Sequence, residues 1–340
     1  MKRTILYVVL AFIVAPIFVS CYQSHKKKLD LAYALVESRP DSALALMKHI
    51  DQEGLSKEEM AKYALTYYIA QDKSGLDLDN DSLIRIAYDW YEGHQEDSLY
   101  VLCLNYMGKF YLLVDSMEQA KSCLEKAYFI SDSLHKMNVK RLVLDKLIEV
   151  EEQLEPYKAL RYAKDMLKMY DSMANVTIYN KVAARLRLGE NFFYVDSLQH
   201  ALEEERKAYR MAMKAGDSNL LSYVRQNLAS TFEEIGEKDS CLYYARLAYD
   251  LNAANRFSCL LTFASAYISV DSLNQAFSLL KQAMPKTAED RYSVFYFQSQ
   301  AAMKAHDFKS AKSFSDSAYH YLEDMYRTAL QGKAAYYTSF

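Results

Sequence analysis

The sequence predicts an all-α protein built from about eight helix–turn–helix repeats, and three observations support this fold class. Gly (8) and Pro (4) are scarce among the 340 residues, whereas β-rich folds of this length need more turn residues. A pattern of small, aromatic and bulky residues returns at fixed offsets, and an Asp-Ser pair returns with it. Hydrophobic residues make up 51% and charged residues 25% of the chain, a composition typical of folded proteins. An array of repeats therefore accounts for the length without a single large core.

The first twenty residues have the features of a secretory signal peptide. Met1, Lys2 and Arg3 form a short positive segment, and an apolar run follows from Ile5 to Val19. This run is shorter than the ~18 residues of a confident membrane span. We therefore expect residues 1–20 to be a signal peptide, and an uncleaved signal anchor is the alternative.

The end of this segment, Phe18-Val19-Ser20-Cys21, resembles the lipobox of bacterial lipoproteins. In that motif a small residue precedes a cysteine that is lipidated and becomes the new N-terminus, although Phe18 stands where Leu is usual. The resemblance implies lipidation of Cys21 and a tether over residues 21–28. Because residue 22 is Tyr rather than Asp, and no acidic run follows, the resemblance also implies an outer-membrane lipoprotein that faces the periplasm. Several acyl chains give firm anchoring.

The repeat itself is visible from Gly108. Tyr111, Ala120, Leu124 and Ala127 follow it at offsets of three, twelve, sixteen and nineteen residues. A small residue and an alanine let two antiparallel helices approach closely, and the aromatic fills the space beside their crossing. The same offsets give four further sets: Gly189, Phe192, Ala201, Glu205, Ala208; Ala229, Phe232, Cys241, Ala245, Ala248; Ala264, Tyr267, Ala276, Leu280, Ala283; and Ser299, Ala302, Ala311, Ser315, Ala318.

This pattern resembles the tetratricopeptide repeat (TPR), and the resemblance covers roughly residues 29–320. It implies a right-handed α-solenoid of paired antiparallel helices. Glu205 and Ser315 depart from the pattern, because they stand where a bulky apolar residue is usual. A further helix is expected over residues 321–340, as a cap or a truncated continuation. The alanine of the second helix falls at Ala43, Leu83, Ala120, Ala159, Ala201, Cys241, Ala276 and Ala311.

A recurring Asp-Ser pair precedes or opens most of these second helices. Asp and Ser side chains are preferred N-caps, because their oxygens accept hydrogen bonds from the free N–H groups of the first turn. We therefore predict that the pairs are helix caps without a catalytic role. They are Asp41-Ser42, Asp81-Ser82, Asp115-Ser116, Asp196-Ser197, Asp239-Ser240 and Asp271-Ser272.

No motif for catalysis or metal binding stands out. The acidic run Asp77–Asp81 could open a calcium loop, but Ser82 stands where that loop needs Gly and Tyr88 where it needs Glu. The histidines show no H-E-x-x-H motif, and the sequence contains no P-loop and no nucleophile elbow. We expect no enzyme activity, no metal and no cofactor. The formal net charge of −3 argues against a nucleic-acid partner.

The function expected by resemblance is binding of another envelope protein or peptide in the groove formed by the first helices. A sensory module of a signalling or transcription regulator is one alternative, and an accessory glycan- or nutrient-binding lipoprotein is the other. Glycan binding usually needs exposed aromatic platforms, and the only tryptophan, Trp90, is expected in the core. By resemblance the groove positions are Asn105, Lys109, Arg141, Glu151, Glu190, Tyr194, Tyr223, Gln226, Ser230, Tyr296 and Gln300.

Overall fold

The structure is a computed structural model that describes residues 26–338, apart from 77, 79–81, 95–97, 136 and 252. Helices are the only regular secondary structure in this part of the chain, as the sequence predicts. The signal peptide and Cys21 lie outside the described residues.

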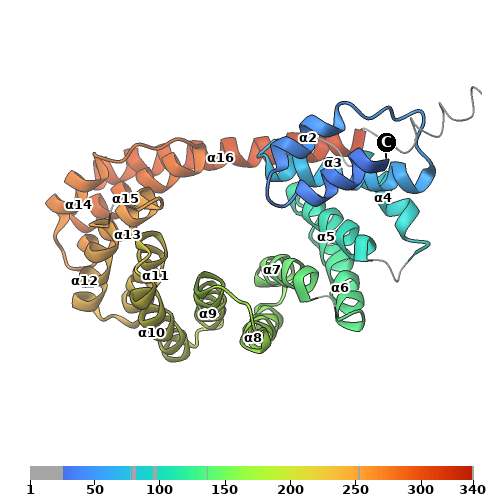
Figure 1. Cartoon of the computed structure of the whole chain (residues 1–340). Coiled ribbons are helices and arrows are strands. Elements are labelled where there is room, and N and C mark those ends of the chain that lie inside the picture. Colours follow the sequence, from blue (N-terminus) through green and yellow to red (C-terminus); the bar gives the residue numbers. More distant parts are fainter. Residues whose placement is uncertain are drawn as a thin grey trace, which may run out of the picture. The chain divides into compact units, whose positions relative to one another are not determined.

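The helices follow one another as pairs, each with a first and a second helix (Figure 1). Counting only described residues, residues 26–35 pair with α2, and seven more pairs follow, which confirms the predicted repeat number. The bounds are α2 Pro40–Met47, α3 Lys57–Lys73, α4 Ser82–Tyr91, α5 Ser98–Leu113, α6 Met117–Ser133, α7 Met137–Leu154, α8 Pro156–Ser172, α9 Ile178–Tyr194, α10 Leu198–Ala215, α11 Ser218–Ile235, α12 Lys238–Tyr249, α13 Arg256–Ser269, α14 Leu273–Leu280, α15 Ala288–Lys304 and α16 Phe308–Thr338.

The chain divides into two compact units, Met1–Lys146 and Leu147–Phe340, with the division inside α7. In the second unit each helix from α8 to α15 contacts the next, and α9, α11, α13 and α15 also contact one another in sequence. First helices of successive pairs are therefore neighbours, which is the arrangement that gives a repeat protein a continuous first-helix surface.

Close packing within a pair confirms the predicted offsets. A Cβ atom on Gly108 would lie 2.6 Å from Cγ of Leu124, sixteen residues on. A Cβ on Gly189 would lie 3.1 Å from Cγ of Glu205 and 3.4 Å from the carbonyl oxygen of Ala201. The small residue is thus required because the second helix occupies the space that a side chain would need.

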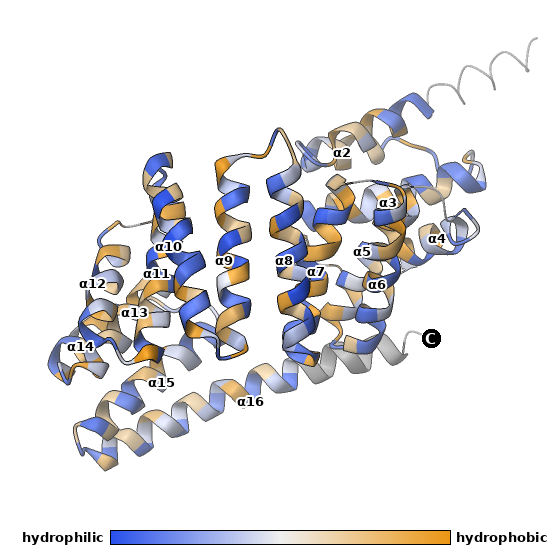
Figure 2. Cartoon of the chain, turned by 90° about the horizontal axis from the view of Figure 1, so that it is seen from below, coloured by the Kyte–Doolittle hydropathy of each residue, from blue (hydrophilic) through white to orange (hydrophobic). Residues whose placement is uncertain are grey.

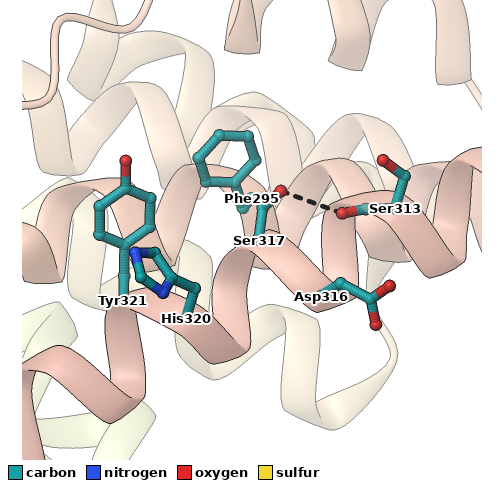
Figure 3. A pocket seen from close by; sticks show the side chains of 6 residues that line it. All are labelled: Phe295, Ser313, Asp316, Ser317, His320 and Tyr321. Carbon is teal, nitrogen blue, oxygen red and sulfur yellow. Dashed lines mark hydrogen bonds between the residues drawn. The ribbon is translucent and has the colours of Figure 1, made fainter.

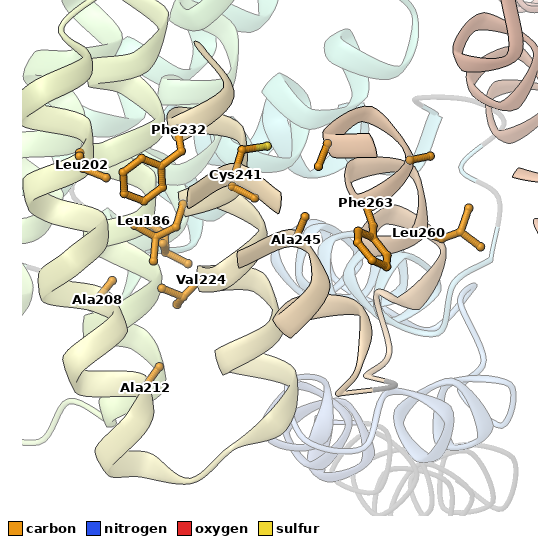
Figure 4. Close-up of a cluster of buried hydrophobic side chains, with 14 of the residues drawn as sticks. Leu186, Leu202, Ala208, Ala212, Val224, Phe232, Cys241, Ala245, Leu260 and Phe263 are labelled. Carbon is orange, nitrogen blue, oxygen red and sulfur yellow. The ribbon is translucent and has the colours of Figure 1, made fainter. Parts of the chain in front are cut away.

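The core of the second unit runs without a break from α9 to α14 (Figure 4). Leu186, Phe232 and Phe263 fill the space between neighbouring helices, and small residues such as Ala208 and Ala245 lie where helices approach closely. Each helix carries both hydrophobic and hydrophilic residues along its length (Figure 2). The stability of this unit therefore depends on contacts between adjacent pairs.

Three of the six Asp-Ser pairs form turns, and for these the predicted capping role of the side chains is wrong. Asp41-Ser42 and Asp239-Ser240 lie in the first turns of α2 and α12, after the N-caps Arg39 and Glu237, and Asp81 lies outside the described residues. Ser116 and Ser272 stand at the N-caps of α6 and α14, yet neither makes a side-chain capping hydrogen bond. The preceding aspartates adopt the left-handed backbone conformation, with φ of 54° at Asp115, 56° at Asp196 and 61° at Asp271. Asp tolerates this conformation better than most residues.

The same hydrogen bonds close each of these turns. The Ser116 N–H donates to the Tyr111 carbonyl oxygen, and the Ser197 N–H donates to that of Phe192, both at 2.8 Å. The acceptor is the repeat's aromatic residue, so the turn joins the end of the first helix to the start of the second. This is the pattern that commonly ends a helix on Gly.

The register of the second pair also differs from the sequence-based assignment. The repeat pattern predicts Leu83 at the close-packed position of α4, but this residue is only half-buried. Ile84, Ala87 and Tyr91 form the buried stripe instead. These three residues follow the three- and four-residue spacing of a helix face, which allows only one set to face the core.

The C-terminal segment continues α16 without a break to Thr338. Residues 321–338 are therefore helical as expected, but they extend the second helix of the eighth pair rather than form a separate helix. Among the described helices, none is both long enough and apolar enough to cross a membrane.

Candidate binding surface

All eleven predicted groove residues lie on first helices, namely α5, α7, α9, α11 and α15. Asn105, Lys109 and Arg141 belong to the first unit, and the other eight belong to the second. The second unit therefore carries most of the candidate surface.

Three of the predicted residues are exposed tyrosines. Tyr194 on α9 is 56% exposed, Tyr223 on α11 46% and Tyr296 on α15 43%. Ser230 and Gln300 are also exposed. An exposed tyrosine offers a large contact area with little loss of side-chain entropy, so these residues can act as anchors for a partner.

Other predicted residues are not available at the surface. Asn105 is 5% exposed and Glu151 is fully buried. Lys109 pairs with Asp72 of the preceding first helix, α3. Arg141 is half-buried. The structure thus places Asn105 and Glu151 in the interior, and Lys109 holds two first helices together.

A set of polar contacts joins α7, α9 and α11, and we call it the first-helix ladder. The amide nitrogen of Asn191 donates to Glu152 Oε1 at 2.9 Å, and that of Asn227 donates to Glu190 Oε1 at 3.0 Å. Arg187 lies between the two carboxylates, with Nη1 3.5 Å from Glu152 Oε1 and 3.6 Å from Glu190 Oε2. The predicted residue Glu190 is therefore held in a fixed position beside the exposed Tyr194.

The electrostatics of the ladder follow from this geometry. Burial raises the pKa of Glu152 above its ordinary value, and Arg187 and Asn191 partly offset that rise. Burial also raises the pKa of Tyr194, and the carboxylates of Glu152 and Glu190 add to the rise. Tyr194 therefore presents a neutral hydroxyl next to two carboxylates at neutral pH.

The ladder continues on α11 and α13 through Gln226. Its amide nitrogen donates to Ser258 Oγ, and its amide oxygen accepts from Asn255 Nδ2 at 2.9 Å. Further along, Ser265 Oγ donates to Glu233 Oε1 at 2.6 Å. Both amide atoms of Gln226 are thus used within the protein, so this residue positions α13 against α11.

A depression with a volume of about 400 Å³ lies between α15 and α16 (Figure 3). Phe295 and Tyr321 stack at 5.8 Å between ring centroids, and Asp316 and His320 lie beside them. The Ser317 hydroxyl donates to the carbonyl oxygen of Ser313 at 3.0 Å. No group of three or more His, Cys, Asp or Glu side chains in the described part of the chain is arranged to hold a metal ion.

Sequence reasoning missed the ladder, although a signal for it exists. Each pair joins residues one repeat apart, for example 37 positions between Asn227 and Glu190 and 39 between Asn191 and Glu152. A search for complementary polar residues at the repeat spacing would have found these pairs.

Comparison with known proteins supports the fold. No protein-family model matches the chain, and no curated protein matches it. Among solved structures, the apo form of RapI aligns with a TM-score of 0.67 and 14% identity, over 88% of this chain and 86% of that one. A Rap protein complexed with Competence and Sporulation Factor aligns with a TM-score of 0.60 and 14% identity, over 91% and 99%.

A third similar structure is a STAND protein, PH0952 from Pyrococcus horikoshii, which has a tetratricopeptide repeat sensor. It aligns with a TM-score of 0.61 and 13% identity, over 90% of this chain and 47% of that one. At these identities the likeness concerns the fold, and it establishes a TPR-like helical-repeat solenoid for this chain.

Proposed function

We propose that this chain is a lipid-anchored scaffold of the cell envelope whose first-helix surface binds an extended peptide or a helix of another protein. The observation that carries the proposal is the exposure of three tyrosines on first helices, namely Tyr194, Tyr223 and Tyr296. Glu190 and Gln226, which lie beside Tyr194 and Tyr223 on the same helices, are held in place by the first-helix ladder, so this part of the surface is formed before the partner arrives. A pre-formed surface lowers the entropic cost of binding.

The charge of this surface indicates the kind of partner. Glu152, Glu190 and Glu233 contribute three carboxylates to the ladder, whereas Arg187 is the cation that faces two of them. An excess of carboxylate attracts positively charged segments. We therefore propose that the bound segment carries Lys or Arg beside an apolar or aromatic residue.

The similar structures agree with peptide or protein binding as the use of such a surface. One of them is a Rap protein complexed with Competence and Sporulation Factor, and another carries a tetratricopeptide repeat sensor. The part of the proposal that concerns the envelope rests on the N-terminal sequence alone, through the lipobox resemblance at Cys21. We propose attachment to the outer membrane with the solenoid in the periplasm, and a binding role without catalysis.

Affinity capture with matched variants tests this function. The tagged full chain would be purified from cells in mild detergent, and bound proteins would be identified by mass spectrometry. Replacement of Tyr194 and Tyr223 by alanine should remove the specific partner without changing the helical content measured by circular dichroism. A control variant carries Tyr157→Ala and Tyr243→Ala, which remove tyrosines that are at least as exposed from the second helices α8 and α12. Equal capture by both variants would refute the assignment of the surface.

A further inference from the structure

One contact between a second helix and the next first helix combines an aromatic ring, a carboxylate and a cation, and it joins α6 to α7. In α6, Tyr128 and Asp132 lie eight and twelve residues after the close-packed Ala120. Lys140 of α7 binds both, with Nζ 4.8 Å from the centre of the Tyr128 ring and 2.6 Å from Asp132 Oδ1. In this pair of helices α6 thus presents an aromatic ring and a carboxylate, and α7 supplies the cation.

In three later pairs one of these two positions receives a cation. Asp171, twelve residues after Ala159, lies 3.8 Å from Arg185 of α9. In two other pairs an arginine of the next first helix lies over the tyrosine that stands eight residues after the close-packed position. Tyr209 lies 5.9 Å from the Arg225 guanidinium, and Tyr249 lies 4.2 Å from that of Arg256. Between α6 and α16 no other second helix carries both residues, since Leu167 stands at the tyrosine position of α8 and Met213 at the acidic position of α10.

The last second helix carries the same two residues, but no described first helix follows it. Tyr319 lies eight residues after Ala311 and is 66% exposed, and Glu323 lies twelve residues after it. Leu322 is 44% and Tyr326 66% exposed on the same stretch of α16. Glu323 has a surface ion pair with Arg327 at 3.8 Å, a distance at which little stability is gained. We call Tyr319, Leu322, Glu323 and Tyr326 the α16 face.

The helix at the other end of the array has the matching residues. Residues 26–35 form the first helix of the first pair, in which Lys27 is exposed and Leu31 is 50% exposed. An apolar residue four positions after the cation is also found at Lys140 and Leu144 in α7. The positive charge of Lys27, beside the exposed Lys26, complements the negative charge of Glu323.

We propose that the α16 face binds the first helix, residues 26–35, of a second copy of this chain. Lys27 of one copy then lies against Tyr319 and Glu323 of the other, as Lys140 lies against Tyr128 and Asp132 within the chain. The two surfaces differ from each other, so the contact is head to tail. A head-to-tail contact leaves a free surface at each end, and the assembly therefore grows beyond a dimer unless it closes into a ring.

Sedimentation equilibrium of the full chain in detergent tests this proposal. It measures how the average mass of the protein depends on its concentration. The wild type should increase in mass beyond a dimer as the concentration rises. Glu323→Lys and Lys27→Glu should each weaken association by about tenfold or more, because like charges then face one another. The double variant, with the charges exchanged, should associate as the wild type does.

A control distinguishes charge from position. Asp145→Lys makes the same change of charge as Glu323→Lys on an exposed site in the middle of α7, and it should leave association unchanged. A wild type that stays monomeric, or association that the single variants leave unaltered, would overturn the proposal. Capture by the first-helix surface is measured separately, so either proposal can fail without the other.

Discussion

At the scale of single residues, Glu205 is the clearest departure from the repeat pattern. It is 2% exposed and stands where a bulky apolar residue is usual. Thr231 Oγ1 donates to its Oε1 at 2.8 Å, while Oε2 has no hydrogen-bond partner among the described residues. Burial raises its pKa from 4.5 to about 7, and nearby Glu190 adds to the rise. A core position thus holds an acid that is half-ionised near neutral pH.

This acid makes stability depend on pH. Because the pKa is higher in the folded state, its contribution is fully present below about pH 4.5 and is lost as the pH rises towards 7. The loss amounts to about 3 kcal/mol when complete. Glu205→Gln keeps the hydrogen bond from Thr231 and removes the charge, so it should raise the free energy of unfolding at pH 8 by roughly 1–3 kcal/mol and change little at pH 5.

Thermal denaturation of the two proteins at both pH values would measure this difference. The exposed Glu203 offers a control, since Glu203→Gln should leave the pH profile nearly unaltered. An unchanged profile in Glu205→Gln would show that the carboxyl group of Glu205 does not titrate in this range.

Gly108 gives a second prediction at this scale. Its α-hydrogen faces Leu124, and a Cβ would lie 2.6 Å from Cγ of that leucine. Gly108→Ala should therefore destabilise the protein by about 1–3 kcal/mol, despite the better helix propensity of alanine. The double variant Gly108→Ala, Leu124→Ala should lose less free energy of unfolding than the sum of the losses in the two single variants, as measured by urea unfolding. Additive losses would mean that the helices do not meet at this point.

At the scale of helices and turns, the Asp-Ser pairs show what a sequence can and cannot give. The positions of the turns were predictable, because Asp and Ser are common wherever a helix starts or ends. The role of the two residues was not predictable. Asp and Ser favour both a capping side chain and a left-handed backbone, and the sequence alone does not show which backbone angle φ the residue adopts. In the three pairs that form turns, the aspartate supplies the left-handed residue and the serine supplies a backbone N–H.

Two substitutions separate these roles. Ser116 is 6% exposed and its hydroxyl has no hydrogen-bond partner among the described residues, so Ser116→Ala should leave stability unchanged or raise it. If Ser116 were a capping residue, its replacement by alanine would instead lower the free energy of unfolding by about 1 kcal/mol. Asp196→Ala should cost about 1 kcal/mol, because alanine tolerates the left-handed conformation poorly, whereas Asp196→Gly should cost less. Chemical denaturation of the three variants would decide between the two roles.

At the scale of the whole molecule, the sequence predicted the fold because the repeat is encoded locally. Gly108 with Leu124, and Gly189 with Glu205, meet as the offsets require. The groove was predicted less completely. The resemblance identified the first helices, but it could not show that Glu151 is buried or that Gln226 is bonded to α13. Those outcomes depend on the neighbouring pair, whose side chains the pattern of one repeat does not specify.

Site-specific photo-crosslinking in living cells tests whether the first-helix surface of the second unit binds a partner. A photo-reactive amino acid would replace Tyr194, Tyr223 or Tyr296 on the first helices, and Tyr157 or Tyr243 on the second helices as controls. We expect one discrete crosslinked product from the first-helix positions and none from the controls. Crosslinks only at the second-helix positions, or at none of the five, would contradict the account.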